Sequence, residues 1–180
     1  MTTVEIEFKN LLTKPEYERL LKHFAVDQKA IRTQTNIYFD TPTLALKQQQ
    51  KALRIRITNE TQALTLKAKS KQGHLEIEQM IDKQHLNGFI QGPVYDALIA
   101  LGVDISSLKS IAKLTTKRAH FPYEAGTLFL DESFYGDQVD YEVEYEALDY
   151  QEGLAVFQKF LADHQIPIRH AEPKIARALS

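Results

Sequence analysis

Pairs of like charges, separated by a single residue, recur along this chain of 180 residues. Clustered carboxylates bind Mg²⁺ or Mn²⁺, because these hard cations prefer oxygen ligands. Arginine and lysine bind phosphate oxygens through charge-assisted hydrogen bonds. A metal-bound polyphosphate makes both demands at once. The residues whose spacing suits that chemistry are Glu5 and Glu7, Arg54 and Arg56, Lys67 and Lys69, Glu76 and Glu78, and Glu142, Glu144 and Glu146.

The charged pairs belong to segments in which charged and apolar residues alternate with period two. This alternation predicts β-strands, and it places both charges of a pair on one face because successive side chains point to opposite sides. Lys9 closes the acidic face of the first segment. Further along the chain Arg118 shares a face with His120, and Asp131 shares a face with Phe129.

These charged faces have two explanations. An antiparallel sheet often turns one face to water, so the charges could form an ordinary solvated surface. Two features favour an alternative: glutamate is a poor strand former yet recurs on separate strands, and close like charges repel unless something neutralises them. If the sheet curls with its charged face inward, the strands enclose a pore lined by carboxylates and by Arg and Lys side chains.

The same patterns predict the elements that position these residues. Capping pairs, Thr13 with Glu16 and Asp149 with Glu152, open two helices, whereas the segment 44–50 is ambiguous. Short turns between strands favour antiparallel pairing, so we expect one α+β domain over residues 1–180. Strands are expected at 4–9, 36–40, 53–57, 64–69, 75–78, 115–121, 127–134 and 139–145, and further helices at 94–101 and 174–179.

Composition limits the classes of function. The chain has 22 basic and 24 acidic residues and a net charge of -2, so it lacks the basic excess typical of nucleic-acid binding. The absence of cysteine excludes disulfides, thiolate zinc sites and cysteine nucleophiles. No apolar run approaches the roughly 18 residues that cross a bilayer, and no signal-peptide pattern is present. We therefore expect a cytoplasmic protein without a membrane partner.

Other catalytic motifs are missing from the sequence. Neither Gly-x-Gly-x-x-Gly nor Gly-x-x-x-x-Gly-Lys occurs, so neither a Rossmann nor a P-loop nucleotide site is supported. Ser133 lacks the Gly-x-Ser-x-Gly context of a nucleophile elbow. The six histidines show no metal-ligand spacing, although His120 is of interest because it shares the face of Arg118.

The ordered set of segments resembles a known family. Glu5-Ile6-Glu7-Phe8-Lys9 is similar to the N-terminal Glu-x-Glu-x-Lys motif of the CYTH superfamily, the triphosphate tunnel metalloenzymes, and the chain is most similar to the short bacterial YjbK-like group. This resemblance implies an eight-stranded antiparallel β-barrel that forms a tunnel, with helices packed outside. The later segments that match in family order are NIYFDT at 36–41, LRIR at 53–56, LTLKAK at 64–69, EIE at 76–78, TKR at 116–118, FLD at 129–131 and YEVEYE at 141–146.

The resemblance also implies roles for single residues. Glu5 and Glu7 would bind metal from the first strand, with Asp131 near the metal site. Two of the three late glutamates, Glu142, Glu144 and Glu146, would do the same. Glu76 and Glu78 would bind a second metal or orient the lysines. Phosphate oxygens would be held by Lys9, Arg54, Arg56, Lys67, Lys69 and Arg118, with Lys174 and Arg177 at a tunnel mouth.

The function that the resemblance implies is hydrolysis of inorganic triphosphate or a small organic triphosphate, with Mg²⁺ or Mn²⁺ as cofactor. Tripolyphosphate, ATP and thiamine triphosphate are the candidate substrates. A class IV-like adenylate cyclase, making cyclic AMP and pyrophosphate from ATP, is the alternative, because the same tunnel would serve both reactions. A non-catalytic polyphosphate- or nucleotide-binding module is a third reading. A barrel without free edge strands permits either a monomer or a homodimer.

Overall fold

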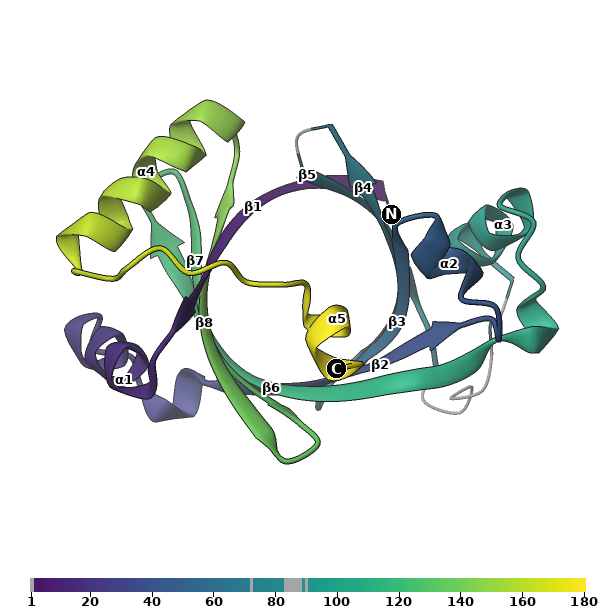
Figure 1. Ribbon diagram of the computed structural model, residues 1–180, viewed down its shortest axis with the longest axis horizontal. Helices are drawn as coiled ribbons and strands as arrows, with labels where there is room; N and C mark the ends of the chain where they lie inside the picture. Colours follow the sequence, from purple (N-terminus) through teal and green to yellow (C-terminus); the bar gives the residue numbers. More distant parts are fainter. Residues whose placement is uncertain (1, 72, 83–88, 90) are drawn as a thin grey trace. The chain divides into compact units, whose positions relative to one another are not determined.

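Eight strands form a closed antiparallel β-barrel, which confirms the expected fold. The computed structural model describes residues 2–71, 73–82, 89 and 91–180. The strands hydrogen-bond in the order β1-β5-β4-β3-β2-β6-β7-β8. Their bounds, with the labels of Figure 1, are β1 (Thr2–Leu12), β2 (Arg32–Asp40), β3 (Lys51–Ile57), β4 (Gln62–Ser70), β5 (Gly73–Met80), β6 (Lys109–Tyr123), β7 (Gly126–Tyr135) and β8 (Gln138–Ala147).

The helices begin where the capping residues predict. Thr13 Oγ1 accepts a hydrogen bond from the Glu16 amide at 3.3 Å, and Glu16 Oε2 accepts one from the Thr13 amide at 2.8 Å. Asp149 Oδ1 accepts from the Glu152 amide at 2.9 Å. The bounds are α1 (Lys14–His23), α2 (Ala45–Gln48), α3 (Pro93–Ala100), α4 (Tyr150–Asp163) and α5 (Lys174–Ala178).

The ambiguous segment 44–50 contains the short helix α2. Two of its N–H groups are satisfied by Asp40, a buried residue at the end of β2, whose carboxylate accepts from Leu46 and Lys47 at 2.9 and 3.0 Å, and Thr41 Oγ1 accepts from Ala45 at 3.0 Å. A helix this short is not stable alone, so the cap and its packing decide whether it forms. Because Asp40 lies several residues upstream, the local spacing of an N-cap does not reveal it.

Strand β6 is longer than its sequence pattern predicts. It begins at Lys109, not at Thr115. Small and polar residues such as Ser110 and Ala112 interrupt the apolar alternation, but strand pairing needs only backbone N–H and C=O groups. The pattern therefore locates the centre of the strand better than its ends.

The described chain divides into two compact units, each with an apolar cluster of its own. Unit 1 comprises Met1–Val4, Gln34–Leu114 and Lys174–Ser180, and unit 2 comprises Glu5–Thr33 and Thr115–Pro173. The single domain over residues 1–180 stays a prediction.

In unit 1, helices α2 and α3 pack against one face of the sheet formed by β3, β4 and β5. Alternate strand residues supply the apolar side of this contact, and the residues between them lie on the opposite face. The opposite face carries the charged residues of β3 and β4. The buried apolar members include Leu46, Leu53, Ile55, Leu64, Leu66, Val94 and Leu98.

In unit 2, helices α1 and α4 both pack against β8. A two-residue turn with Gly136 at a φ of +53° joins β7 to β8, so their registers are fixed over the whole hairpin. Here too a set of charged residues, including Asp131 and Glu142, occupies the face away from the helices, whereas Lys117 and Glu132 pair on the side of α1. The buried apolar members include Leu20, Leu128, Leu130, Val143, Tyr145, Phe157 and Phe160.

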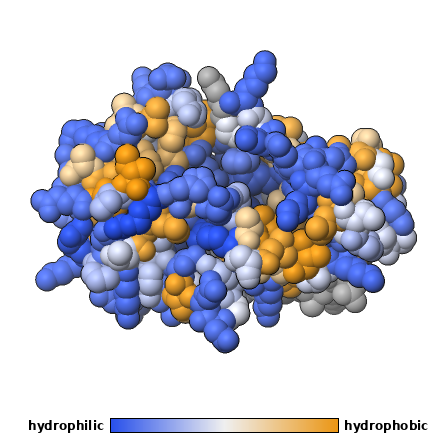
Figure 2. Space-filling view, in the orientation of Figure 1, coloured by the Kyte–Doolittle hydropathy of each residue, from blue (hydrophilic) through white to orange (hydrophobic). Residues whose placement is uncertain are grey.

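Hydrophilic residues cover much of the face drawn in Figure 2, with hydrophobic residues in smaller groups between them. Single exposed apolar side chains such as Leu148 and Ile168 are ordinary on a folded surface. None of the helices in the described part of the chain is long and apolar enough to cross a membrane.

A buried asparagine holds the segment that follows α4 against β1. Asn10 Nδ2 donates to the Pro167 carbonyl at 3.0 Å, and Asn10 Oδ1 accepts from the Arg169 amide at 2.8 Å. The Arg169 guanidinium then donates to both carboxylate oxygens of Glu16, at 2.7 and 3.1 Å. The hydrogen bonds from Arg169 lower the pKa of Glu16 from its ordinary value of 4.5.

We expect Glu16→Gln to destabilise the protein in a pH-dependent way. The pKa of Glu16 is lower in the folded than in the unfolded chain, so its charge stabilises the fold above the unfolded pKa, and this contribution is lost as the pH falls through the folded pKa. Urea unfolding should show a lower midpoint for the variant at neutral pH, and the difference should shrink as the pH falls below the ordinary pKa of glutamate.

Glu18→Gln on the same helix is the matched control, because Glu18 is exposed and its contact with Lys14 is 3.8 Å long. Its midpoint should stay close to that of the wild type. Equal losses in the two variants, or a loss in Glu16→Gln that does not change with pH, would contradict the assignment.

Candidate functional site

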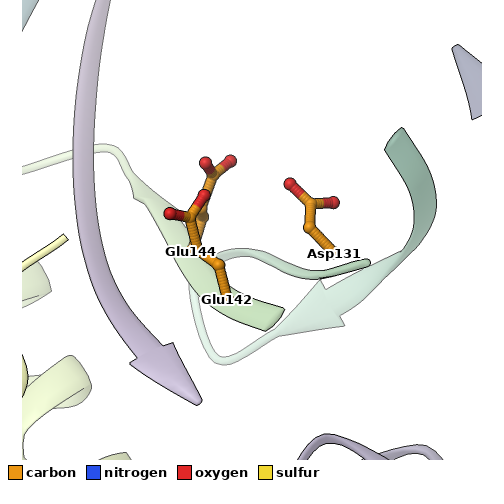
Figure 3. A group of neighbouring side chains, drawn as sticks. All are labelled: Asp131, Glu142 and Glu144. Carbon is orange, nitrogen blue, oxygen red and sulfur yellow. The ribbon is translucent and has the colours of Figure 1, made fainter. Parts of the chain in front are cut away.

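Three carboxylates gather on the polar face of unit 2. Asp131 of β7 lies directly opposite Glu142 of β8, and Glu144 follows on the same face. One oxygen from each carboxylate lies within 4.8 Å of the others, and all three residues are buried. Figure 3 shows the three side chains reaching one region from the two adjacent strands. Alternation produces the group, because Leu130 and Val143 fill the apolar cluster on the other face. We call Asp131, Glu142 and Glu144 the carboxylate group.

Arg118 of β6 binds the carboxylate group. Its Nε and one terminal nitrogen donate to the two oxygens of Asp131 at 2.7 and 2.6 Å, and the same nitrogen donates to Glu144 at 2.5 Å. The guanidinium also lies over the ring of Phe129, 4.5 Å from its centroid. Burial alone would lower the pKa of Arg118, but the charges of Asp131, Glu144 and Glu7 outweigh it and hold the pKa well above its ordinary value. Arg118 is therefore a permanent cation at this site.

Strand β1 adds further charges beside β8. Lys9 lies opposite Glu144 in the strand register, and Glu7 lies opposite Glu146. Lys9 Nζ is 3.1 Å from Glu7 Oε1, and the half-buried Glu5 shares their face. Glu146 is exposed and lies outside the carboxylate group. Of the three late glutamates, the structure thus brings two together with Asp131.

The carboxylate group fits a small divalent cation. Oxygens that coordinate one Mg²⁺ octahedrally lie about 3–4 Å apart, since each is about 2.1 Å from the ion. Oxygens already within 4.8 Å of one another need only small side-chain movements to reach that spacing. The donor type also fits, because Mg²⁺ and Mn²⁺ prefer carboxylate oxygens. An ion here would share two of its carboxylates with Arg118.

Two cations converge on a single carboxylate oxygen in unit 1. Arg54 and Lys67 place their terminal nitrogens 3.4 and 3.2 Å from Glu76 Oε1. Lys67 lies opposite Glu76 in the β4–β5 register, and Arg54 reaches the same oxygen from β3. Glu76 is buried, so its charge holds both cations on the polar face.

Arg56 has a neutral partner. Its Nε donates to Asn36 Oδ1 at 3.2 Å across the β2–β3 register. Asn36 is buried, and its amide oxygen helps to orient the guanidinium. Glu78 is half-buried on the same face of β5 as Glu76.

The other predicted phosphate-binding residues of unit 1 lie in different surroundings. Lys69 is exposed near the end of β4, and the ion pairs seen in the described chain do not include it. Lys174 is the first residue of α5, and Arg177 is buried on the same short helix. Thus the structure brings Arg54, Lys67 and Glu76 together, but not Lys69.

Sequence reasoning missed two polar residues of unit 1. Asn36 lies opposite Arg56, and Thr65 lies opposite Arg54. Period-two alternation places both on the charged face, and this signal could have found them. The pairing of residues across neighbouring strands depends on the strand register, and the local sequence does not determine that register.

The sequence comparisons agree on one family. The CYTH domain family model matches residues 3–179. Over 177 residues the chain is 41% identical to YjbK of Bacillus subtilis (strain 168), a protein assigned as a triphosphatase, and the match covers 97% of this chain and 93% of YjbK.

The structural comparisons agree with the sequence. A protein from Bacillus halodurans, assigned as an adenylate cyclase, is similar with a TM-score of 0.95 and 37% identity over 99% of each chain. HpAC1 from Hippeastrum shares the fold with a TM-score of 0.81 and 24% identity, over 99% of this chain and 95% of its own. Because the family model spans nearly the whole chain and a relative aligns over the same length at 41% identity, this protein belongs to the CYTH domain family.

Proposed function

We propose that this protein is a metal-dependent triphosphatase that hydrolyses inorganic triphosphate or a small organic triphosphate. The observation that carries the proposal is the buried carboxylate group bound to Arg118. Three carboxylates and one guanidinium leave an excess of negative charge that a divalent cation would neutralise. The relative assigned as a triphosphatase, at 41% identity over 97% of this chain, supports the same activity.

Asp131, Glu142 and Glu144 are the residues proposed to hold the metal, with Glu5 and Glu7 of the neighbouring strand β1 as further ligands. When bound, Mg²⁺ or Mn²⁺ would supply Lewis-acid stabilisation of negative charge on phosphate oxygens. Mn²⁺ and Mg²⁺ both suit these oxygen donors, so the proposal includes either ion.

The cations of this chain are proposed to bind the phosphate oxygens directly. Arg54 and Lys67 contact Glu76 in the structure, and an incoming phosphate oxygen would replace that contact with a charge-assisted hydrogen bond. Arg56, oriented by its bond to Asn36, is proposed as a further phosphate ligand in unit 1, and Lys9 as one in unit 2. Because these groups are positioned before substrate arrives, little reorganisation is needed during the reaction.

The reaction itself balances simply. A water oxygen forms a bond to the terminal phosphorus, and the bond from that phosphorus to the bridging oxygen breaks. Tripolyphosphate would yield orthophosphate and pyrophosphate, with the water proton passing to the surrounding oxygens. Phosphoryl transfer of this kind depends mainly on positioning and charge stabilisation, which the Arg and Lys residues provide.

A class IV-like adenylate cyclase is the second candidate, and the similar Bacillus halodurans protein assigned as an adenylate cyclase favours it. In that reaction the ribose 3′-hydroxyl of ATP attacks the α-phosphorus, and pyrophosphate leaves. The same charged residues would serve both reactions, so the products must distinguish them.

The product assay tests the proposed function directly. Purified protein is incubated with tripolyphosphate, ATP or thiamine triphosphate, with Mg²⁺, Mn²⁺ or EDTA. We expect metal-dependent release of orthophosphate, because the carboxylate group needs a cation. Formation of cyclic AMP and pyrophosphate from ATP would contradict the triphosphatase proposal and support the adenylate cyclase. Binding of the triphosphates without any product would identify a binding module.

Glu142→Gln should abolish the response to metal. It removes one charge from the carboxylate group, and we expect activity to fall at least about 100-fold, equal to about 2.7 kcal/mol of transition-state stabilisation. The thermal stabilisation of the wild type by Mn²⁺ should also disappear. Glu146→Gln is the matched substitution two residues further along β8, and it should keep both properties because Glu146 is exposed. Equal loss in the two variants would contradict this assignment of ligands.

Arg54→Ala should lower kcat/KM for tripolyphosphate at least about tenfold, or about 1.4 kcal/mol, because a phosphate contact is lost. The variant also removes one of the two cations at Glu76, so unfolding must be measured beside activity. Arg32→Ala, at an exposed position at the start of β2, should leave both quantities unchanged. A folded Arg54→Ala variant with wild-type kinetics would remove Arg54 from the phosphate-binding set.

A further inference from the structure

Thr65 lies in the middle of the basic group of unit 1. Its neighbours on β4, Leu64 and Leu66, belong to the apolar cluster, so Thr65 belongs to the opposite, charged face. In the strand registers it lies opposite Arg54 on one side and opposite Glu78 on the other. Directly opposite residues on antiparallel strands have Cβ atoms about 4.5–5.5 Å apart. Thr65 is therefore a direct cross-strand neighbour of Arg54 on the charged face.

The hydroxyl of Thr65 is fully buried, at 0% exposure, and has no hydrogen-bond partner among the described residues. Burying a hydroxyl without a partner costs folding free energy, so such groups are rare and call for an explanation. Valine has the same shape without this cost and forms strands well. Folding alone therefore does not favour threonine at this position.

Unit 2 shows how buried hydroxyls on the charged face are normally satisfied. Thr116 of β6 and Ser133 of β7 lie opposite each other, are both buried, and share a hydrogen bond of 3.1 Å. The Thr65 hydroxyl has no such hydrogen-bond partner among the described residues, although Thr65 lies between Arg54 and Glu78 in the strand registers.

The nearby cations indicate what kind of acceptor fits. Arg54 and Lys67 both approach a single oxygen, Oε1 of Glu76, so they converge on one point. Lys67 follows Thr65 by two residues on the same face of β4. A phosphate oxygen bound by these two cations has further lone pairs, and a hydroxyl donates well to an anionic oxygen.

We propose that Thr65 is a substrate-binding residue whose hydroxyl donates a hydrogen bond to a phosphate oxygen held by Arg54 and Lys67. The inference rests on the proposed triphosphatase function and adds a neutral donor to its cationic site. It explains why a buried hydroxyl is left without a partner: its acceptor arrives with the substrate. The ligand is the polyphosphate of the proposed function, one oxygen of which would contact both cations and the hydroxyl.

Thr65→Val tests this inference, because valine keeps the shape and removes only the donor. We expect the variant to be more stable in urea, since the unsatisfied hydroxyl is gone, yet to bind tripolyphosphate about tenfold more weakly, equal to about 1.4 kcal/mol. Its kcat/KM should fall by at least the same factor. Thr65→Ser keeps the hydroxyl and should retain affinity and kcat/KM within about threefold of the wild type, about 0.65 kcal/mol.

Gln62→Met is the matched control. Gln62 lies on the same strand, and its Oε1 is also buried without a hydrogen-bond partner, but it shares the face of Leu64 and Leu66. The control should gain stability, as Thr65→Val does, without any change in affinity or kcat/KM. This comparison separates removal of an unsatisfied group from removal of a substrate contact.

Calorimetric binding of tripolyphosphate and the hydrolysis assay are run on all four proteins, with Mg²⁺ and with Mn²⁺. A Thr65→Val protein that binds and hydrolyses like the wild type overturns the inference and leaves the proposed function intact. A Thr65→Ser protein as impaired as Thr65→Val also overturns it, because the hydroxyl would then not be the group that matters. A wild type that neither binds nor hydrolyses any triphosphate removes the proposed function, and the inference with it.

Discussion

The repulsion among Asp131, Glu142 and Glu144, and its partial relief by Arg118, is the interaction on which the candidate site depends. Three buried carboxylates with oxygens within 4.8 Å of one another would be strongly unfavourable alone. Arg118 binds two of them, and their negative charges raise its pKa because they stabilise the protonated guanidinium. One guanidinium carries less charge than three carboxylates, and this difference supports the proposed metal-binding role.

Unit 1 gathers basic side chains around one buried carboxylate. Arg54 and Lys67 share one oxygen of Glu76, and Arg56 is held by the neutral amide of Asn36. Glu76 therefore holds two cations in place, and the proposal is that a phosphate oxygen takes its position between them.

The alternation that places these charged residues on one face of the strands also places apolar residues on the other face, where they form the two cores. Leu130 and Asp131 are neighbours in sequence, yet one enters the apolar cluster beneath α1 and α4 and the other enters the carboxylate group. On β4, Leu64 and Thr65 are separated in the same way. A shift of one residue in strand register would exchange the two sets and bury charge in the core. Hydrophobic packing therefore fixes the positions of the charged residues.

The sequence alone located the centres of the strands, the capped helices α1 and α4, and the residue types of the candidate site, because each follows from local spacing. It could not separate Glu146 from Glu142 and Glu144, since all three share a face and differ only in burial. It left α2 undecided because the capping residue Asp40 belongs to the preceding strand. It gave no sign that Thr65 lies opposite Arg54. Only the tertiary structure decided these points, because cross-strand register and burial arise from packing between segments distant in the chain, whereas alternation and capping are properties of neighbouring residues.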